Sequence, residues 1–140
     1  MSYRILVINP GSTSTKVAVY AGREKIYAEN IKHPQEEIAA FSKINDQKEY
    51  RIDLIYNTLS QGNIKLSDID AVIGRGGLGK PIEGGIYAIN DAMLNDVKNA
   101  VYGDHAANLG AIIAKEMADS IKVPALVMDP VSVDEMEPEA

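Results

Sequence analysis

The residues that follow the first apolar run of the chain have types and a spacing that suit phosphate binding. Gly11 permits a tight turn, the next four residues each carry a hydroxyl group, and a lysine ends the segment. A short loop of small residues presents several backbone N–H groups to one side, and such a concavity binds phosphate oxygens. The candidate phosphate-binding residues are Gly11, Ser12, Thr13, Ser14, Thr15 and Lys16.

The loop is not a Walker A motif. No second glycine precedes Lys16, and Val17 stands where that motif has the Ser or Thr that holds magnesium. The segment by itself also fits a polar turn that joins two strands and binds nothing. The neighbouring elements are needed to choose between the two interpretations.

Apolar periodicity places this loop between two strands. Residues 5–8 form an unbroken apolar run, which is typical of a strand covered on both faces, and Asn9 to Gly11 is expected to end it. Residues 16–20 predict a second strand. Residues 23–31 predict a third, antiparallel strand after a turn at Gly22.

Helices and strands alternate in the rest of the chain. A helix is expected to begin near Asp46, which has capping-box spacing to Glu49, and to end at Gly62. Its apolar face is Ile52, Ile55, Tyr56 and Leu59. The remaining elements are a short helical stretch after Pro34, a buried strand at 71–73, a glycine-rich loop at 74–85, an extended segment at 86–89, helices at 90–102 and 103–121, and a last strand at 124–128. This order predicts one α/β domain with a mixed sheet and helices on both faces.

Four further polar residues are expected to lie near one edge of this sheet. Ligands of α/β folds gather outside the carboxyl ends of the strands, and Asn9, Arg75 and Asp129 each end or follow a strand. His105 lies near the start of a helix, where backbone N–H groups favour anions. Each of the four also has a purely structural interpretation, as a turn residue, a solvated cation, a helix-start histidine or a strand terminator.

Composition excludes several classes of function. The 140 residues carry a net charge of −6, so no basic surface indicates a nucleic-acid or membrane partner. The chain has no cysteine, which excludes disulfides and thiolate metal sites, and its two histidines are too few for a multi-histidine metal site. The first apolar run is too short for a signal peptide, so we expect a cytoplasmic protein.

Several segments resemble the acetokinase family. The run from Asn9 to Lys16 is similar to its N-x-G-S-x-S-x-K segment. Three later segments resemble the butyrate kinase branch of that family: Gly74-Arg75-Gly76-Gly77 with Lys80-Pro81 and Gly84-Gly85, Gly103-Asp104-His105-Ala106-Ala107-Asn108, and Val127-Met128-Asp129-Pro130-Val131. The resemblance extends over almost the whole chain.

The resemblance implies an actin-like ATPase (ribonuclease H-like) domain and reversible phosphoryl transfer between ATP and butyrate. The cofactors would be ATP/ADP and Mg²⁺. Arg75 would pair with the substrate carboxylate and His105 would contact the transferred phosphoryl group. Asn9 and Asp129 would act at the magnesium ion. Acetate, propionate and branched-chain acids stay open as alternative substrates.

Members of the family have two similar domains, and the resemblance covers the first. Residues 1–140 are therefore expected to be the N-terminal domain of a two-domain acyl kinase, without the second nucleotide-binding domain. We expect the full-length enzyme to be a homo-oligomer and the 140 residues alone to be inactive. Two other hypotheses stay open: another member of the actin-like superfamily, such as a sugar kinase or a chaperone-type ATPase, and a fragment that folds without catalysing.

Overall fold

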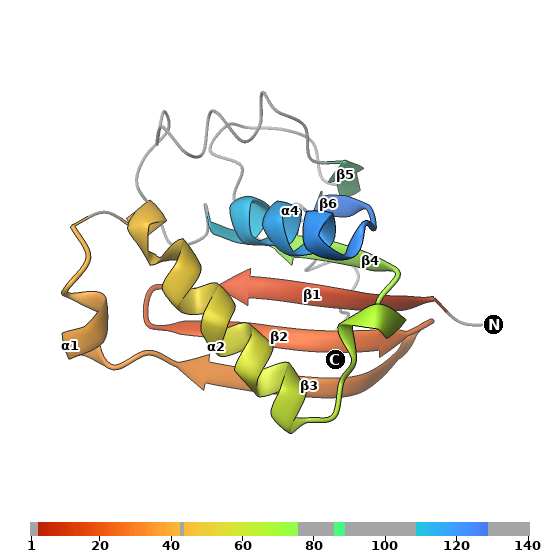
Figure 1. Cartoon of the computed structure of the whole chain (residues 1–140), viewed down its shortest axis with the longest axis horizontal. Coiled ribbons are helices and arrows are strands. Elements are labelled where there is room, and N and C mark those ends of the chain that lie inside the picture. Colours follow the sequence, from red (N-terminus) through yellow and green to blue (C-terminus); the bar gives the residue numbers. More distant parts are fainter. Residues whose placement is uncertain (1–2, 43, 76–85, 89–108, 129–140) are drawn as a thin grey trace.

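The computed structural model describes residues 3–42, 44–75, 86–88 and 109–128 (Figure 1). The strands of this part are β1 Arg4–Pro10, β2 Ser14–Ala21, β3 Glu24–Lys32, β4 Ala71–Arg75, β5 Ile86–Ala88 and β6 Ala125–Met128. The α-helices are α1 Gln35–Ile38, α2 Lys48–Gln61 and α4 Leu109–Ile121, and two 3₁₀ turns are η1 Ile44–Gln47 and η2 Leu66–Asp68.

The six strands form one mixed sheet in the order β3-β2-β1-β4-β6-β5. The first three strands are an antiparallel meander. Strand β4 runs parallel to both β1 and β6, whereas β5 is antiparallel to β6. The mixed α/β sheet that the element order predicted is therefore confirmed, and the extended segment predicted after the glycine-rich loop is β5.

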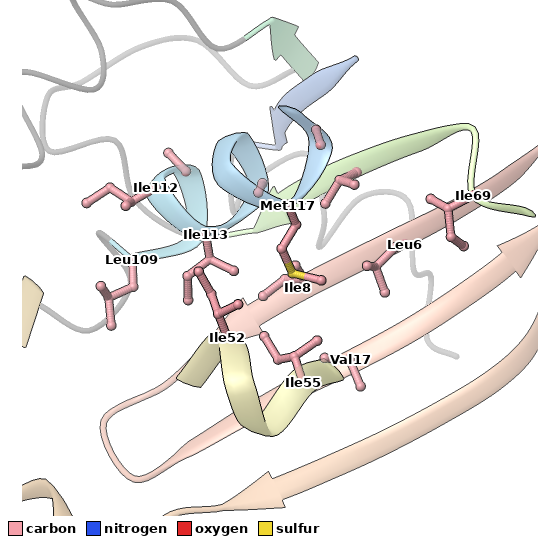
Figure 2. Close-up of a cluster of buried hydrophobic side chains, with 14 of the residues drawn as sticks. Leu6, Ile8, Val17, Ile52, Ile55, Ile69, Leu109, Ile112, Ile113 and Met117 are labelled. Atoms are coloured by element: carbon pink, nitrogen blue, oxygen red, sulfur yellow. The ribbon is translucent and has the colours of Figure 1, made fainter. Parts of the chain in front are cut away.

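Helices α2 and α4 lie against the same face of the sheet, α2 across the meander and α4 along β4 and β6 (Figure 1). Alternate residues of the strands point toward them, because successive side chains of a strand face opposite sides. Figure 2 shows strand residues such as Leu6, Ile8 and Val17 facing Ile55 of α2 and Met117 of α4. The helix predicted at 90–102 lies outside the described residues.

Both long helices bury an apolar face, and that of α2 follows the predicted spacing. In α2, Ile52, Ile55 and Leu59 are buried and Tyr56 is half-buried. The buried residues of α4 are Leu109, Gly110, Ala111, Ile112, Ile113, Ala114, Met117 and Ala118. None of the helices in the described ranges is both long and apolar enough to cross a membrane.

The start of α2 differs from the prediction. The helix begins at Lys48, its N-cap is Gln47, and no side chain caps it. Asp46 lies in η1, one residue before the N-cap, and its carboxylate accepts a hydrogen bond from the Ser42 hydroxyl instead. The Gln47 side chain turns inward and contacts an arginine one helical turn later.

Strand β1 is also longer than predicted, since it continues through Asn9 and Pro10. It stays paired with β2 up to Pro10 opposite Thr15, whereas its pairing with β4 ends at Ile8. No strand on the β4 side therefore requires the N–H group that proline lacks. The loop between β1 and β2 consequently shortens to three residues, Gly11 to Thr13.

Candidate functional site

The carboxyl ends of three parallel strands meet at one edge of the sheet. Strand β1 ends at Pro10, β4 at Arg75 and β6 at Met128. The register pairs Ile8 of β1 with Gly74 of β4. Asn9 and Arg75 are the next residues of these two neighbouring strands. Arg75 itself pairs with Met128. This edge is where ligands bind in open α/β sheets.

The described structure places only part of the expected set of polar residues at this edge. Asn9 is half-buried there, and Arg75 is the last residue of β4. His105 and Asp129 lie outside the described residues, although Asp129 directly follows the end of β6. Asn9 pairs with Lys16 across β1 and β2, so the two side chains share the sheet face opposite Ile8 and Val17.

The loop itself is compact and exposed at its tip. The Gly11 N–H group donates to the Ser14 carbonyl oxygen at 2.7 Å and closes the turn. Ser12 and Thr13 at the tip are exposed, as is Lys16. These three residues are therefore accessible to a ligand.

Thr15 is also a predicted phosphate-binding residue, but it differs from these three. It belongs to β2 and is fully buried, and its Oγ1 atom lies 2.7 Å from His33 Nε2 and 3.2 Å from Arg51 Nη1. Its side chain points to the helix side of the sheet with Val17, because alternate residues of a strand share a face. The Thr15 hydroxyl is therefore part of the support beneath the loop, and Thr15 is not accessible to a ligand as a phosphate-binding residue would have to be.

Arg51 of α2 provides most of that support. Its side chain is fully buried, and its guanidinium donates to the carbonyl oxygens of two loop residues, Gly11 at 2.7 Å and Ser12 at 3.3 Å, and to that of Ser14 at the start of β2 at 3.1 Å. The Gln47 Oε1 atom accepts from Nε at 3.0 Å and from Nη2 at 2.8 Å, which holds the planar group in place. A helix residue 40 positions away in sequence thus sets the shape of the loop.

The carbonyl oxygens of the loop and its N–H groups differ in their hydrogen bonding. Arg51 occupies the carbonyl oxygens of Gly11, Ser12 and Ser14, and the His33 N–H group donates to the carbonyl oxygen of Thr13 at 2.9 Å. Within the described part of the chain, the N–H groups of Ser12 and Thr13 have no acceptor, and both residues are exposed. The acceptors of the loop are thus satisfied from inside, while two donors remain for a ligand, an arrangement that suits an anion.

His33 is buried beside this support as a neutral group. Burial and the nearby Arg51 guanidinium lower the pKa of His33 from 6.5 to about 4, although Glu37 acts in the opposite direction. The Tyr50 ring lies 5.3 Å from the imidazole, and burial together with a hydrogen bond to Glu37 raises the pKa of Tyr50 to about 12. Among the described residues, His33 Nδ1 has no hydrogen-bond partner, so a proton added there would gain no acceptor.

The lowered pKa of His33 predicts a loss of stability in acid. Below its ordinary pKa of 6.5 the unfolded chain binds a proton at this histidine, whereas the folded chain does not until near pH 4. Between about pH 7 and pH 4.5 this linkage should lower the free energy of unfolding by about 2 kcal/mol. Urea unfolding of the wild type and of His33→Gln at both pH values measures it. The carboxylates titrate in both proteins, so an equal loss in the variant would contradict the assignment.

Sequence reasoning missed Arg51, Gln47 and His33. A usable signal existed for Arg51, which lies four residues before Ile55 and eight before Leu59 and so falls on the buried stripe of its helix. A charged residue on an apolar face indicates a specific partner. The pattern around His33 contains no comparable signal.

Comparison with known proteins supports the resemblance to butyrate kinases that the motifs indicated. The chain is 47% identical over 137 residues to probable butyrate kinases of two Clostridium botulinum strains, Eklund 17B and Alaska E43. The alignment covers 98% of this chain and 39% of each relative, so the chain spans about two fifths of the length of these curated relatives. No family model matches the chain.

Solved structures confirm the fold class. Acetate kinase from Entamoeba histolytica matches 97% of this chain with a TM-score of 0.55 at 14% identity, and the match covers 37% of that protein. T. thermophilus RuvC in complex with a Holliday junction substrate matches 98% of the chain with a TM-score of 0.54 at 12% identity, covering 71% of that protein. Identities this low show the fold alone, which is the actin-like ATPase, or ribonuclease H-like, fold.

Proposed function

We propose that this chain, which is related to butyrate kinases over 98% of its length, is the N-terminal domain of a two-domain enzyme that transfers a phosphoryl group between ATP and butyrate. The observation that supports this most directly is the 47% identity to probable butyrate kinases. The loop between β1 and β2 agrees with it, because the N–H groups of two exposed residues have no acceptor in the described structure and fit the phosphate oxygens of a nucleotide.

The proposed reaction needs positioning and charge stabilisation more than proton transfer. The carboxylate is already ionised at neutral pH, so its oxygen attacks the γ-phosphorus without a general base. The bond from the γ-phosphorus to the bridging oxygen breaks, and ADP leaves with that electron pair. The products are butyryl phosphate and ADP, and the reverse direction uses the same groups.

Each candidate site residue has a proposed role. Arg75 pairs with the substrate carboxylate through two N–H groups, which brings one anion toward another. His105 donates a hydrogen bond to the oxygens of the transferred phosphoryl group. Ser12, Thr13 and Lys16 hold the phosphates.

Magnesium would be held by Asn9 and Asp129, oxygen-bearing side chains of the type that this ion prefers. Bound there, the ion would neutralise charge on the phosphate oxygens. The half-buried position of Asn9 at the end of β1 fits a ligand or water-holding role. Asp129 lies outside the described residues, so its part of the site is inferred from its place after β6.

Formation of acyl phosphate tests the proposal. The 140-residue chain and the two-domain protein that contains it are each incubated with ATP, Mg²⁺ and either butyrate or acetate, and acyl phosphate is trapped as the hydroxamate. We expect product only from the two-domain protein, and more from butyrate than from acetate. No acyl phosphate with either acid would overturn the carboxylate kinase function. A preference for acetate would retain the reaction and correct the substrate.

A further inference from the structure

The buried charge of Arg51 has no carboxylate partner in the described part of the chain. A guanidinium stays protonated in proteins, and the acceptors around this one are all neutral: an amide oxygen, three carbonyl oxygens and a hydroxyl. The nearby carboxylate of Glu37 accepts a hydrogen bond from the Tyr50 hydroxyl instead. Burial of a charge without an opposite charge is costly, so the fold retains Arg51 at the expense of stability.

A negative charge bound at the tip of the loop would lie close to Arg51. Arg51 contacts the carbonyl oxygens of the loop whose tip is exposed. The same loop carries the two N–H groups that have no acceptor among the described residues. An anion bound to those N–H groups would lie on the outer side of a single layer of backbone, with the guanidinium on the inner side. Charges separated in this way interact more strongly than in water, because the protein between them screens poorly.

We propose that Arg51 is a positioning residue of the phosphate site, and that a phosphate group bound to the Gly11–Thr13 loop is its counter-charge. Arg51 holds the carbonyl oxygens inward, which turns the N–H groups of Ser12 and Thr13 toward the ligand before it binds. The inference rests on the proposed role of this loop in binding phosphate. The inference adds that Arg51 orients the carbonyl oxygens and N–H groups of the loop without touching either substrate.

This role explains why an arginine stands at position 51. Its planar fork reaches several carbonyl oxygens and Gln47 at once, which a lysine ammonium cannot do with the same geometry. Donors that are already oriented need no reorganisation when the ligand binds, so more of the interaction energy appears as affinity. The hydrogen bonds of Gln47 keep the fork aligned with the loop.

Substitution of Arg51 itself is a poor test, because the loss of six hydrogen bonds at a fully buried site can unfold the protein. The substitution Gln47→Glu is a more specific test of the role of Arg51. Gln47 is buried, and glutamate has its shape and can accept the same two hydrogen bonds from Arg51. The new carboxylate supplies an internal counter-charge. If a bound phosphate is the counter-charge of Arg51, neutralising Arg51 in this way should weaken phosphate binding, and an unchanged affinity would contradict the role.

The measurement is an NMR titration of the ¹⁵N-labelled chain with inorganic phosphate, following the amide resonances of Ser12 and Thr13. We expect saturable shifts in the wild type and an apparent Kd about tenfold higher in Gln47→Glu, as one added charge in the same site would produce. Gln61→Glu is the matched control, since Gln61 is exposed at the far end of α2, and its Kd should stay within about twofold of the wild type.

The outcomes separate this inference from the proposed function. Equal phosphate affinity of Gln47→Glu and the wild type would overturn the role of Arg51 and leave the carboxylate kinase proposal intact. No shift of either amide in the wild type would overturn the loop as a phosphate site, and the role of Arg51 with it. Phosphate binding without acyl phosphate formation would overturn the proposed reaction alone. Titration with ADP and with acetyl phosphate then distinguishes a nucleotide phosphate from an acyl phosphate as the ligand.

Discussion

Gly74→Ala is expected to lower the free energy of unfolding by about 3 kcal/mol, the upper part of the range for overpacking a buried site. Gly74 lies in β4 beneath the first turn of α4, and a Cβ atom there would overlap the Gly110 carbonyl oxygen and lie 2.5 Å from its carbonyl carbon. The atoms in the way belong to the backbone, so no rotamer change relieves the overlap. The helix must move away from the strand that ends at Arg75.

Urea unfolding of the 140-residue chain measures this effect, with Gly11→Ala as the matched control. A Cβ atom at Gly11 would lie 3.5 Å from Ser14 Oγ, an ordinary contact distance. The control should therefore change the free energy of unfolding by less than about 1 kcal/mol. A loss below about 1 kcal/mol for Gly74→Ala would mean that α4 and β4 do not approach as closely as described.

Arg75→Ala is expected to lower the kcat/KM for the carboxylate by about 10³-fold in the two-domain protein, the size seen when a charge-stabilising donor is removed from an active site. The proposed reaction brings two anions together, and Arg75 is the cation placed where β4 ends beside β1 and β6. Arg75→Lys keeps the charge but loses the paired N–H groups, so it should restore only part of the activity.

Acyl phosphate formation at varied butyrate concentration measures this effect. Arg23→Ala is the control, because Arg23 is an exposed arginine in the turn between β2 and β3, at the opposite end of these strands from the loop. The control should keep its activity within about twofold of the wild type. Arg75→Ala with activity in that same range would remove Arg75 from the substrate site and would leave the carboxylate without a partner among the proposed residues.

Local sequence patterns were sufficient for most of the fold. Continuous apolar runs identified β1, β4 and β6, and apolar spacing identified the buried face of α2, because a buried element must carry apolar residues at its own period. The glycine and hydroxyl residues after β1 identified the exposed tip of the loop for a similar reason, since a tight turn restricts residue types locally. The motifs from Asn9 to Lys16 and around Arg75 also identified the relationship to butyrate kinases.

The sequence by itself thus determined the elements, their buried faces and the exposed part of the loop. Only the tertiary structure decided what lies beneath that loop. Thr15 resembles its neighbours in sequence, but the strand pairing turns it inward, and the packing of α2 places Arg51 under the carbonyl oxygens of the loop. Such partners are brought together by packing between elements 36 to 40 residues apart, and hydrogen bonds over that separation leave no periodic pattern in a single sequence.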